Sequence, residues 1–127
     1  MGYNYSFFSF NNDRRLSFPV DHTGVTDAEF ATNLPWLEFR AWLIERGGRI
    51  SRRDDDLVEM DYPNEGWIGF RGDNQSVSLD NHAPWTEVLE AFLALKALTD
   101  DVVLFDPQTG TFHDETSFRA QKRCGTQ

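Results

Sequence analysis

The chain has 127 residues, of which 39% are hydrophobic and 26% are charged, and its formal net charge is −9. This length and composition indicate a single folded domain and argue against a disordered chain. The negative charge makes nucleic acid an unfavourable partner, and the lack of a signal-like or membrane-spanning apolar run predicts a cytoplasmic protein with no membrane contact.

The N-terminal third predicts two strands followed by a helix. Residues 3–10 alternate aromatic with small polar side chains, which is the two-residue period of a strand. Residues 14–20 have the composition of a second strand, and turn-forming residues at 11–13 predict a hairpin between the two. A capping-box spacing at 26–29 predicts a short helical turn, and a longer helix is expected over 34–46. We expect this helix to bury Trp36, Phe39, Leu43 and Trp42.

The rest of the chain predicts a strand meander, a second helix and a closing hairpin. Strands are expected over 57–62, 67–71 and 76–80, preceded by a short strand over 49–52. A helix follows, because apolar residues recur at helical spacing at Trp85, Val88, Leu89, Phe92, Leu95 and Leu98. The continuously apolar run at 102–105 predicts a strand that is buried on both faces.

This order of elements predicts an α+β fold, in which a mostly antiparallel sheet has two main helices packed on one face. We expect one domain over residues 1–113. Residues 114–127 are polar and predict a loosely held C-terminal tail.

The stretch LFDPQTGTFHDE, residues 104–115, has two interpretations. Asp106 and His113 could form an acid/base pair of an enzyme, if both reach one open pocket. Alternatively, Asp106 accepts hydrogen bonds from amides two or three residues on, and Gly110 allows the chain to turn back. The turn preferences favour the second interpretation, and we expect His113, Asp114 and Glu115 to lie past the hairpin on its exposed side.

Residues 54–65 carry six carboxylates without one basic residue between them, and Trp67 follows after Gly66. Three interpretations are a solvated turn, an acidic contact surface for a basic partner, and a calcium loop. The calcium loop is disfavoured, because it requires ligands at alternating positions around a glycine. Charge around an aromatic anchor is typical of a binding hot spot. The predicted partner-binding residues are Asp54, Asp55, Asp56, Glu59, Asp61, Glu65 and Trp67, with Asp73, Asp80, Asp114 and Glu115 as weaker choices.

No catalytic, cofactor or metal site is predicted. The histidines have no characteristic spacing to a serine or to the single cysteine, Cys124, and no phosphate-binding or dinucleotide-binding motif is present. One cysteine can form neither an intramolecular disulfide nor a thiolate zinc site.

A last helix that runs into DDVVLFDPQTGTF, residues 100–112, in a small acidic α+β chain resembles the small immunity proteins of bacterial toxin systems. The resemblance implies a cytoplasmic inhibitor that binds a cognate toxin domain, with a basic surface, and blocks its active site. An acidic inhibitor would associate fast with such a surface. The alternatives are a non-enzymatic accessory or regulatory protein-binding module, and an enzyme that uses Asp106 and His113.

Overall fold

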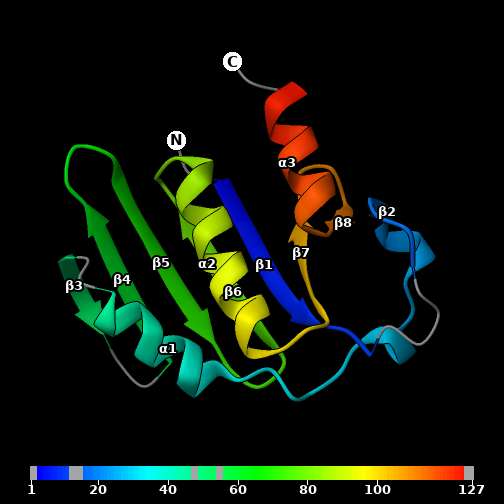
Figure 1. The fold of residues 1–127 in the computed structure, drawn as a ribbon, viewed down its shortest axis with the longest axis horizontal. Coiled ribbons are helices and arrows are strands. Elements are labelled where there is room, and N and C mark those ends of the chain that lie inside the picture. The colour runs from blue at the N-terminus through cyan, green and yellow to red at the C-terminus, as the bar shows by residue number, and fades with distance from the viewer. Residues whose placement is uncertain (1–2, 12–15, 47–48, 54–55, 125–127) are drawn as a thin grey trace.

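The computed structural model describes residues 3–11, 16–46, 49–53 and 56–124. Its elements are β1 (Tyr3–Ser9), β2 (Val20–Asp21), η1 (His22–Gly24), η2 (Asp27–Glu29), α1 (Trp36–Glu45), β3 (Arg49–Arg53), β4 (Leu57–Tyr62), β5 (Gly66–Gly72), β6 (Ser76–Asn81), α2 (Trp85–Leu98), β7 (Val102–Asp106), β8 (Thr111–His113) and α3 (Glu115–Cys124). The strands form one sheet in the order β2-β8-β7-β1-β6-β5-β4-β3, and every neighbouring pair is antiparallel (Figure 1). The predicted α+β fold is confirmed.

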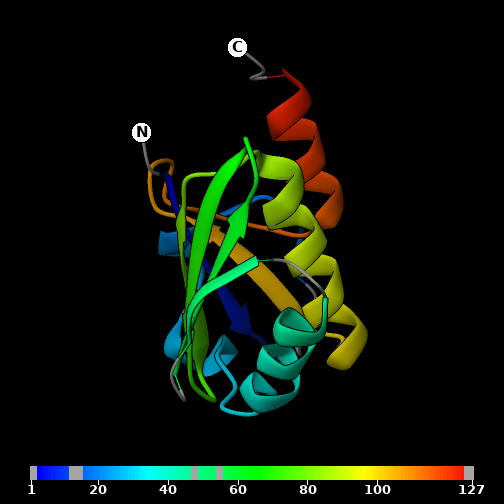
Figure 2. The same ribbon diagram turned by 90° about the vertical axis from the view of Figure 1, so that its left-hand side faces the viewer.

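The helices α1, α2 and α3 lie on the same side of the sheet, as the edge-on view shows (Figure 2). Successive strand residues point to opposite faces, so every second residue of the central strands faces these helices. The main core joins those residues to the buried side of each helix, and its fully buried aromatic members are Tyr5, Phe7, Phe39, Phe70, Phe92 and Phe118. Each of these large rings removes on the order of 150 Å² or more from water, so the core accounts for most of the fold's stability.

A second, smaller cluster covers part of the opposite face. Phe10, Val103 and Phe112 are buried there, and partly buried residues from the segment 16–30 pack against them. Phe10 and Phe30 also form an isolated antiparallel bridge. The segment therefore covers the half of this face formed by β7, β8 and the end of β1. No described element packs over the outward face of β4, β5 and β6.

Most of the predicted elements after residue 34 are confirmed. The expected helices at 34–46 and from Trp85 to Leu98 correspond to α1 and α2, and the four-strand stretch corresponds to β3–β6. In the last hairpin, Gly110 has φ +69°, the left-handed conformation for which a glycine was expected. The Gln108 amide donates to Asp106 Oδ1 at 3.0 Å, as the turn interpretation requires.

The predicted hairpin between residues 3–10 and 14–20 is wrong. β1 lies in the middle of the sheet between β6 and β7, and β2 has only two residues, which pair with β8. Leu16 and Phe18 pack against the second cluster. A central strand pairs with two neighbours, and both neighbours of β1 come from the C-terminal half of the chain. Turn-forming residues predict pairing only between strands that follow one another in the sequence. Residues 12–15 lie outside the described part of the chain.

The predicted C-terminal tail is also wrong over most of its length. Residues 115–124 form α3, and Phe118 has no exposed surface. Asp114 Oδ1 accepts the Ser117 amide at 2.9 Å, which satisfies a free amide of the first helical turn. The Lys122 ammonium lies 4.5 Å from the centre of the Tyr3 ring. The same ammonium lies 5.2 Å from the centre of the Tyr5 ring. The buried Phe118 ring and the cation–π contacts of Lys122 therefore help to attach a mostly polar helix to the domain.

Candidate functional site

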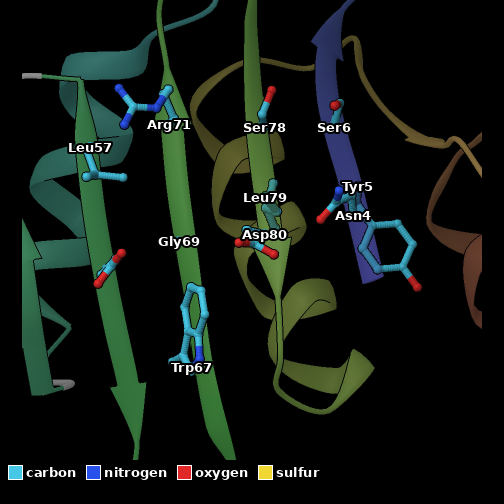
Figure 3. Close-up of a pocket in the computed structure, with 11 residues that line it drawn as sticks. Asn4, Tyr5, Ser6, Leu57, Trp67, Gly69, Arg71, Ser78, Leu79 and Asp80 are labelled. Carbon is cyan, nitrogen blue, oxygen red and sulfur yellow. The ribbon is translucent and has the colours of Figure 1, made fainter. Parts of the chain in front are cut away.

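The outward face of β4, β5, β6 and the start of β1 is polar and hollowed, and we call it the open face. Its hollow has a volume of about 500 Å³. The residues that line it are Asn4, Tyr5, Ser6, Leu57, Glu59, Trp67, Gly69, Arg71, Ser78, Leu79 and Asp80 (Figure 3). Strand alternation explains most of this set, because residues of one parity on each strand face the helices and those of the other parity are left on the open face. Tyr5 and Leu79 are the exceptions, since both belong to the main core.

Gly69 forms the floor of the hollow. It is a buried residue between Trp67 and Arg71 on β5, and these two side chains stand at either end of the gap (Figure 3). A Cβ placed on Gly69 would lie 3.4 Å from Trp67 Cζ3, 3.7 Å from Glu59 Cγ and 3.9 Å from Asp80 Cβ. These are ordinary contact distances, so a methyl group would fit at Gly69 without displacing its neighbours. Because glycine has no side chain, this space on the floor of the hollow is left unfilled.

Trp67 is fixed at the rim of the hollow. Its ring stacks on His82 with the ring centres 4.3 Å apart and an angle of 22° between the planes. The His82 Nε2 lies 3.0 Å from Asp80 Oδ1, and the Asp80 side chain is 57% exposed. Trp67 itself is half-buried. The open face therefore holds an indole in a defined orientation beside a solvated carboxylate.

Basic groups border the acidic ones on this face. Arg71 Nη1 lies 2.6 Å from Asp56 Oδ2, and both side chains are more than half exposed. In the backbone register of the edge strand β3, Arg49 stands opposite Asp61 and Arg52 stands opposite Glu59. Asp56, which lacks a base next to it in the sequence, thus meets a base from a neighbouring strand.

The structure brings together only some of the predicted partner-binding residues. Glu59, Asp61 and Trp67 share the open face, and Asp61 stands directly opposite Trp67 in the register of β4 and β5. Asp56 is at the end of the face beside Arg71. Asp54 and Asp55 lie outside the described residues.

Glu65 lies apart from the hollow, in the turn between β4 and β5, where its amide donates to the Tyr62 carbonyl at 2.8 Å. Burial raises the pKa of Glu87 on α2; Arg46 opposes the shift, and the carboxylates of Glu90 and Glu65 add to it. The Glu65 carboxylate therefore affects the pKa of a residue on α2, at the edge of the helix layer.

Sequence reasoning missed Asn4 and Ser6 on β1, Ser78 on β6, and both Gly69 and Arg71 on β5. The strand period could have identified them, because Gly69 and Arg71 have the parity of Trp67. Asp80, a weaker choice from the sequence, lines the hollow.

Asp106 and His113 do not form the acid/base site that the sequence left open. Asp106 has no exposed surface, and its two oxygens accept the Tyr3 hydroxyl at 3.0 and 2.9 Å. Gln121 Nε2 donates to Oδ2 at 3.0 Å. The carboxylate is thus enclosed by donors from β1, α3 and its own turn, which is a structural arrangement.

His113 is buried, which corrects the expectation that it lies on the exposed side of the hairpin. Its Nδ1 lies 2.9 Å from Ser117 Oγ, and its Nε2 lies 2.8 Å from Thr111 Oγ1. Burial lowers the pKa of His113; the carboxylates of Asp106 and Asp114 oppose this shift, and Lys122 adds to it. The ring joins β8 to the first turn of α3.

Within the described residues, no three side chains of His, Cys, Asp or Glu come together in a group that could hold a metal ion. None of the described helices combines the length and the apolar character that crossing a membrane requires. Comparisons with protein-family models, with curated proteins and with solved structures found no significant match.

Proposed function

We propose that this chain is an immunity-type protein, which binds a cognate bacterial toxin domain through the open face and blocks the toxin's active site. The observation that carries the proposal is the half-buried Trp67, which is set among Glu59, Asp61 and Asp80 on a part of the sheet that no described element covers. An oriented aromatic side chain inside a polar rim is the usual composition of a protein-binding hot spot.

Charge supports a basic partner. The net charge of −9 attracts a basic protein over long range and accelerates association at low salt. Toxin domains that act on nucleic acid or nucleotides often present basic clefts, which an acidic surface can occlude. The polar face of β4–β6 supplies the docking area, and the helix layer on the other side supports it.

The function is tested by co-expression with the product of a toxin-like reading frame next to the gene. We expect the chain to restore growth to cells that make this toxin and to form a complex with it in vitro. An accessory or regulatory module would use the same face, but it would not protect these cells. Failure to protect against the neighbouring toxin, or the absence of such a reading frame, would count against the proposal.

The location of the interface is tested with two triple variants of equal charge change. The first, Glu59→Gln with Asp61→Asn and Asp80→Asn, changes the open face. The second, Glu38→Gln with Glu45→Gln and Asp100→Asn, changes exposed carboxylates on or next to the helix layer. The open-face variant should slow association about tenfold at low salt and weaken its salt dependence, whereas the control should change the rate much less. Equal effects of the two variants would place the interface elsewhere.

A further inference from the structure

One row of residues crosses the open face at the level of the hollow. Glu59 on β4, Gly69 on β5, Asp80 on β6 and Asn4 on β1 stand opposite one another in register. The row therefore has a gap at Gly69 with one acidic residue on each side of it. Two strand spacings separate the backbones of these acidic residues by about 10 Å.

The two ends of the gap differ in charge. At one end the Trp67 ring leans over the position of a Gly69 Cβ, at 3.4 Å, and is backed by His82. At the other end the positive charge of Arg71 is balanced by Asp56, at 2.6 Å. The centre of the gap is therefore bordered by the Asp80 carboxylate, by Glu59, which also interacts with another group, and by an aromatic ring. Carboxylates beside an aromatic ring attract a cation.

We propose that the Gly69 hollow is the receptor for a single arginine side chain of the protein partner. A guanidinium carries donors on two edges, so it can reach the carboxylates of Glu59 and Asp80 together and lie against the Trp67 indole. A lysine ammonium is a compact charge, which pairs well with only one of the two carboxylates. This inference rests on the proposed function, because the arginine belongs to the toxin.

The inference is tested without a toxin, by following the ¹⁵N–¹H NMR spectrum of the protein during titration with the blocked peptide acetyl-Gly-Arg-Gly-amide. We expect saturable shifts centred on the Gly69 and Asp80 amides and the Trp67 indole N–H, with a dissociation constant on the order of millimolar. The neutral peptide with citrulline in place of arginine should bind about tenfold more weakly, and the lysine peptide should fall between them. Equal shifts with the citrulline peptide, or no shift at this site with the arginine peptide, would overturn the inference.

Variants separate binding in the hollow from general attraction to an acidic protein. Gly69→Val places a branched side chain on the floor of the hollow and Asp80→Asn removes one carboxylate, and each should weaken binding of the arginine peptide about tenfold. Glu38→Gln, on the exposed side of α1, changes the net charge as much as Asp80→Asn does and should leave binding unchanged. Unchanged spectra of core residues in each variant confirm that the fold is retained. Arginine binding that survives Gly69→Val would contradict the inference.

The outcome for the hollow and the outcome for the function can be told apart. If the chain protects cells through the open face but the hollow does not bind the arginine peptide, the proposed function stands and the inference of an arginine receptor is wrong. If the hollow binds arginine selectively but the chain protects no cell from the neighbouring toxin, the receptor stands as a site for an arginine-bearing protein and the immunity function is wrong.

Discussion

The sheet carries acidic side chains on both of its faces, and the two sets have opposite surroundings. Asp106 faces α3, has no exposed surface, and accepts hydrogen bonds from Tyr3, Gln108 and Gln121. Asp80 faces solvent from the open face, with 57% of its side chain exposed. The buried carboxylate of Asp106 therefore stabilises the fold, whereas the exposed carboxylate of Asp80 is available to a partner.

This comparison shows that the density of acidic residues in the sequence is a poor guide to their role. Asp106 is isolated from other acids in the sequence, and its carboxylate accepts hydrogen bonds from three residues. The crowded run at 54–65 supplies Glu59 and Asp61 to an open surface. We therefore expect substitutions on the helix side of the sheet to change stability, and substitutions on the open face to change binding.

The largest expected effect comes from Asp106→Ala. Removal of the carboxylate leaves the Tyr3 hydroxyl, the Gln108 amide and the Gln121 side chain without their buried acceptor. We expect the free energy of unfolding, measured by chemical denaturation, to fall by about 3 kcal/mol or more. The matched change Asp80→Ala should cost less than about 0.5 kcal/mol, because its carboxylate is solvated. Similar losses in both variants would remove the distinction between the two faces.

A smaller effect is expected from two glycines of β5 that lie on opposite faces. A Cβ on Gly72 would overlap the Trp36 ring, with Cδ2 at 2.7 Å and Cζ3 at 2.8 Å, whereas a Cβ on Gly69 meets nothing closer than 3.4 Å. We expect Gly72→Ala to destabilise the protein by about 2 kcal/mol. Gly69→Ala should change stability by less than about 0.5 kcal/mol or raise it slightly, since alanine restricts the unfolded chain. Thermal unfolding of both variants checks the difference, and a larger loss at Gly69 would contradict it.

The elements with a clear period could be predicted from the sequence. Apolar residues alternate with polar ones in two of the strands, and each of them lies in the main core on the helix side: Val58, Met60, Val77 and Leu79. The pairing of β1 could not be predicted, because its partners Val77 and Leu104 are distant in the sequence and turn residues at 11–13 favoured a local hairpin.

The C-terminal helix was missed because Phe118 is the one buried apolar residue among 115–123, so no helical stripe of apolar residues could be recognised. Two local signals were present: Asp114 at the N-terminal cap, and the pair of Glu115 and Arg119 four residues apart, at 2.9 Å.

For the candidate site, strand parity within 57–62 assigned Glu59 and Asp61 to one surface, and Trp67 was added because it follows the carboxylate run as an aromatic residue. It could not identify the hollow, because the hollow depends on register. Gly69 matters only because Glu59 and Asp80 stand on its two sides, and that arrangement exists only in the assembled sheet.

The smallest expected effect is a pH dependence that arises on the helix side of the sheet, at His113. Burial holds the pKa of His113 below its ordinary value of 6.5. Between 6.5 and the lower pKa of the folded state, the unfolded chain binds a proton that the folded chain does not, so folding stability decreases as the pH falls through this range. Above 6.5 the ring is neutral in both states and this contribution to the pH dependence vanishes.

His113→Gln removes this titration while keeping a side chain that can hydrogen-bond Ser117 or Thr111. We expect the variant to be less stable than the wild type near neutral pH, and we expect the difference in unfolding free energy to shrink as the pH is lowered through the range below 6.5. Chemical denaturation of both proteins at a series of pH values measures this difference. A difference that stays constant through this range would show that His113 takes up a proton equally in both states. The buried side of the sheet would then be as tolerant of charge at this position as the open face.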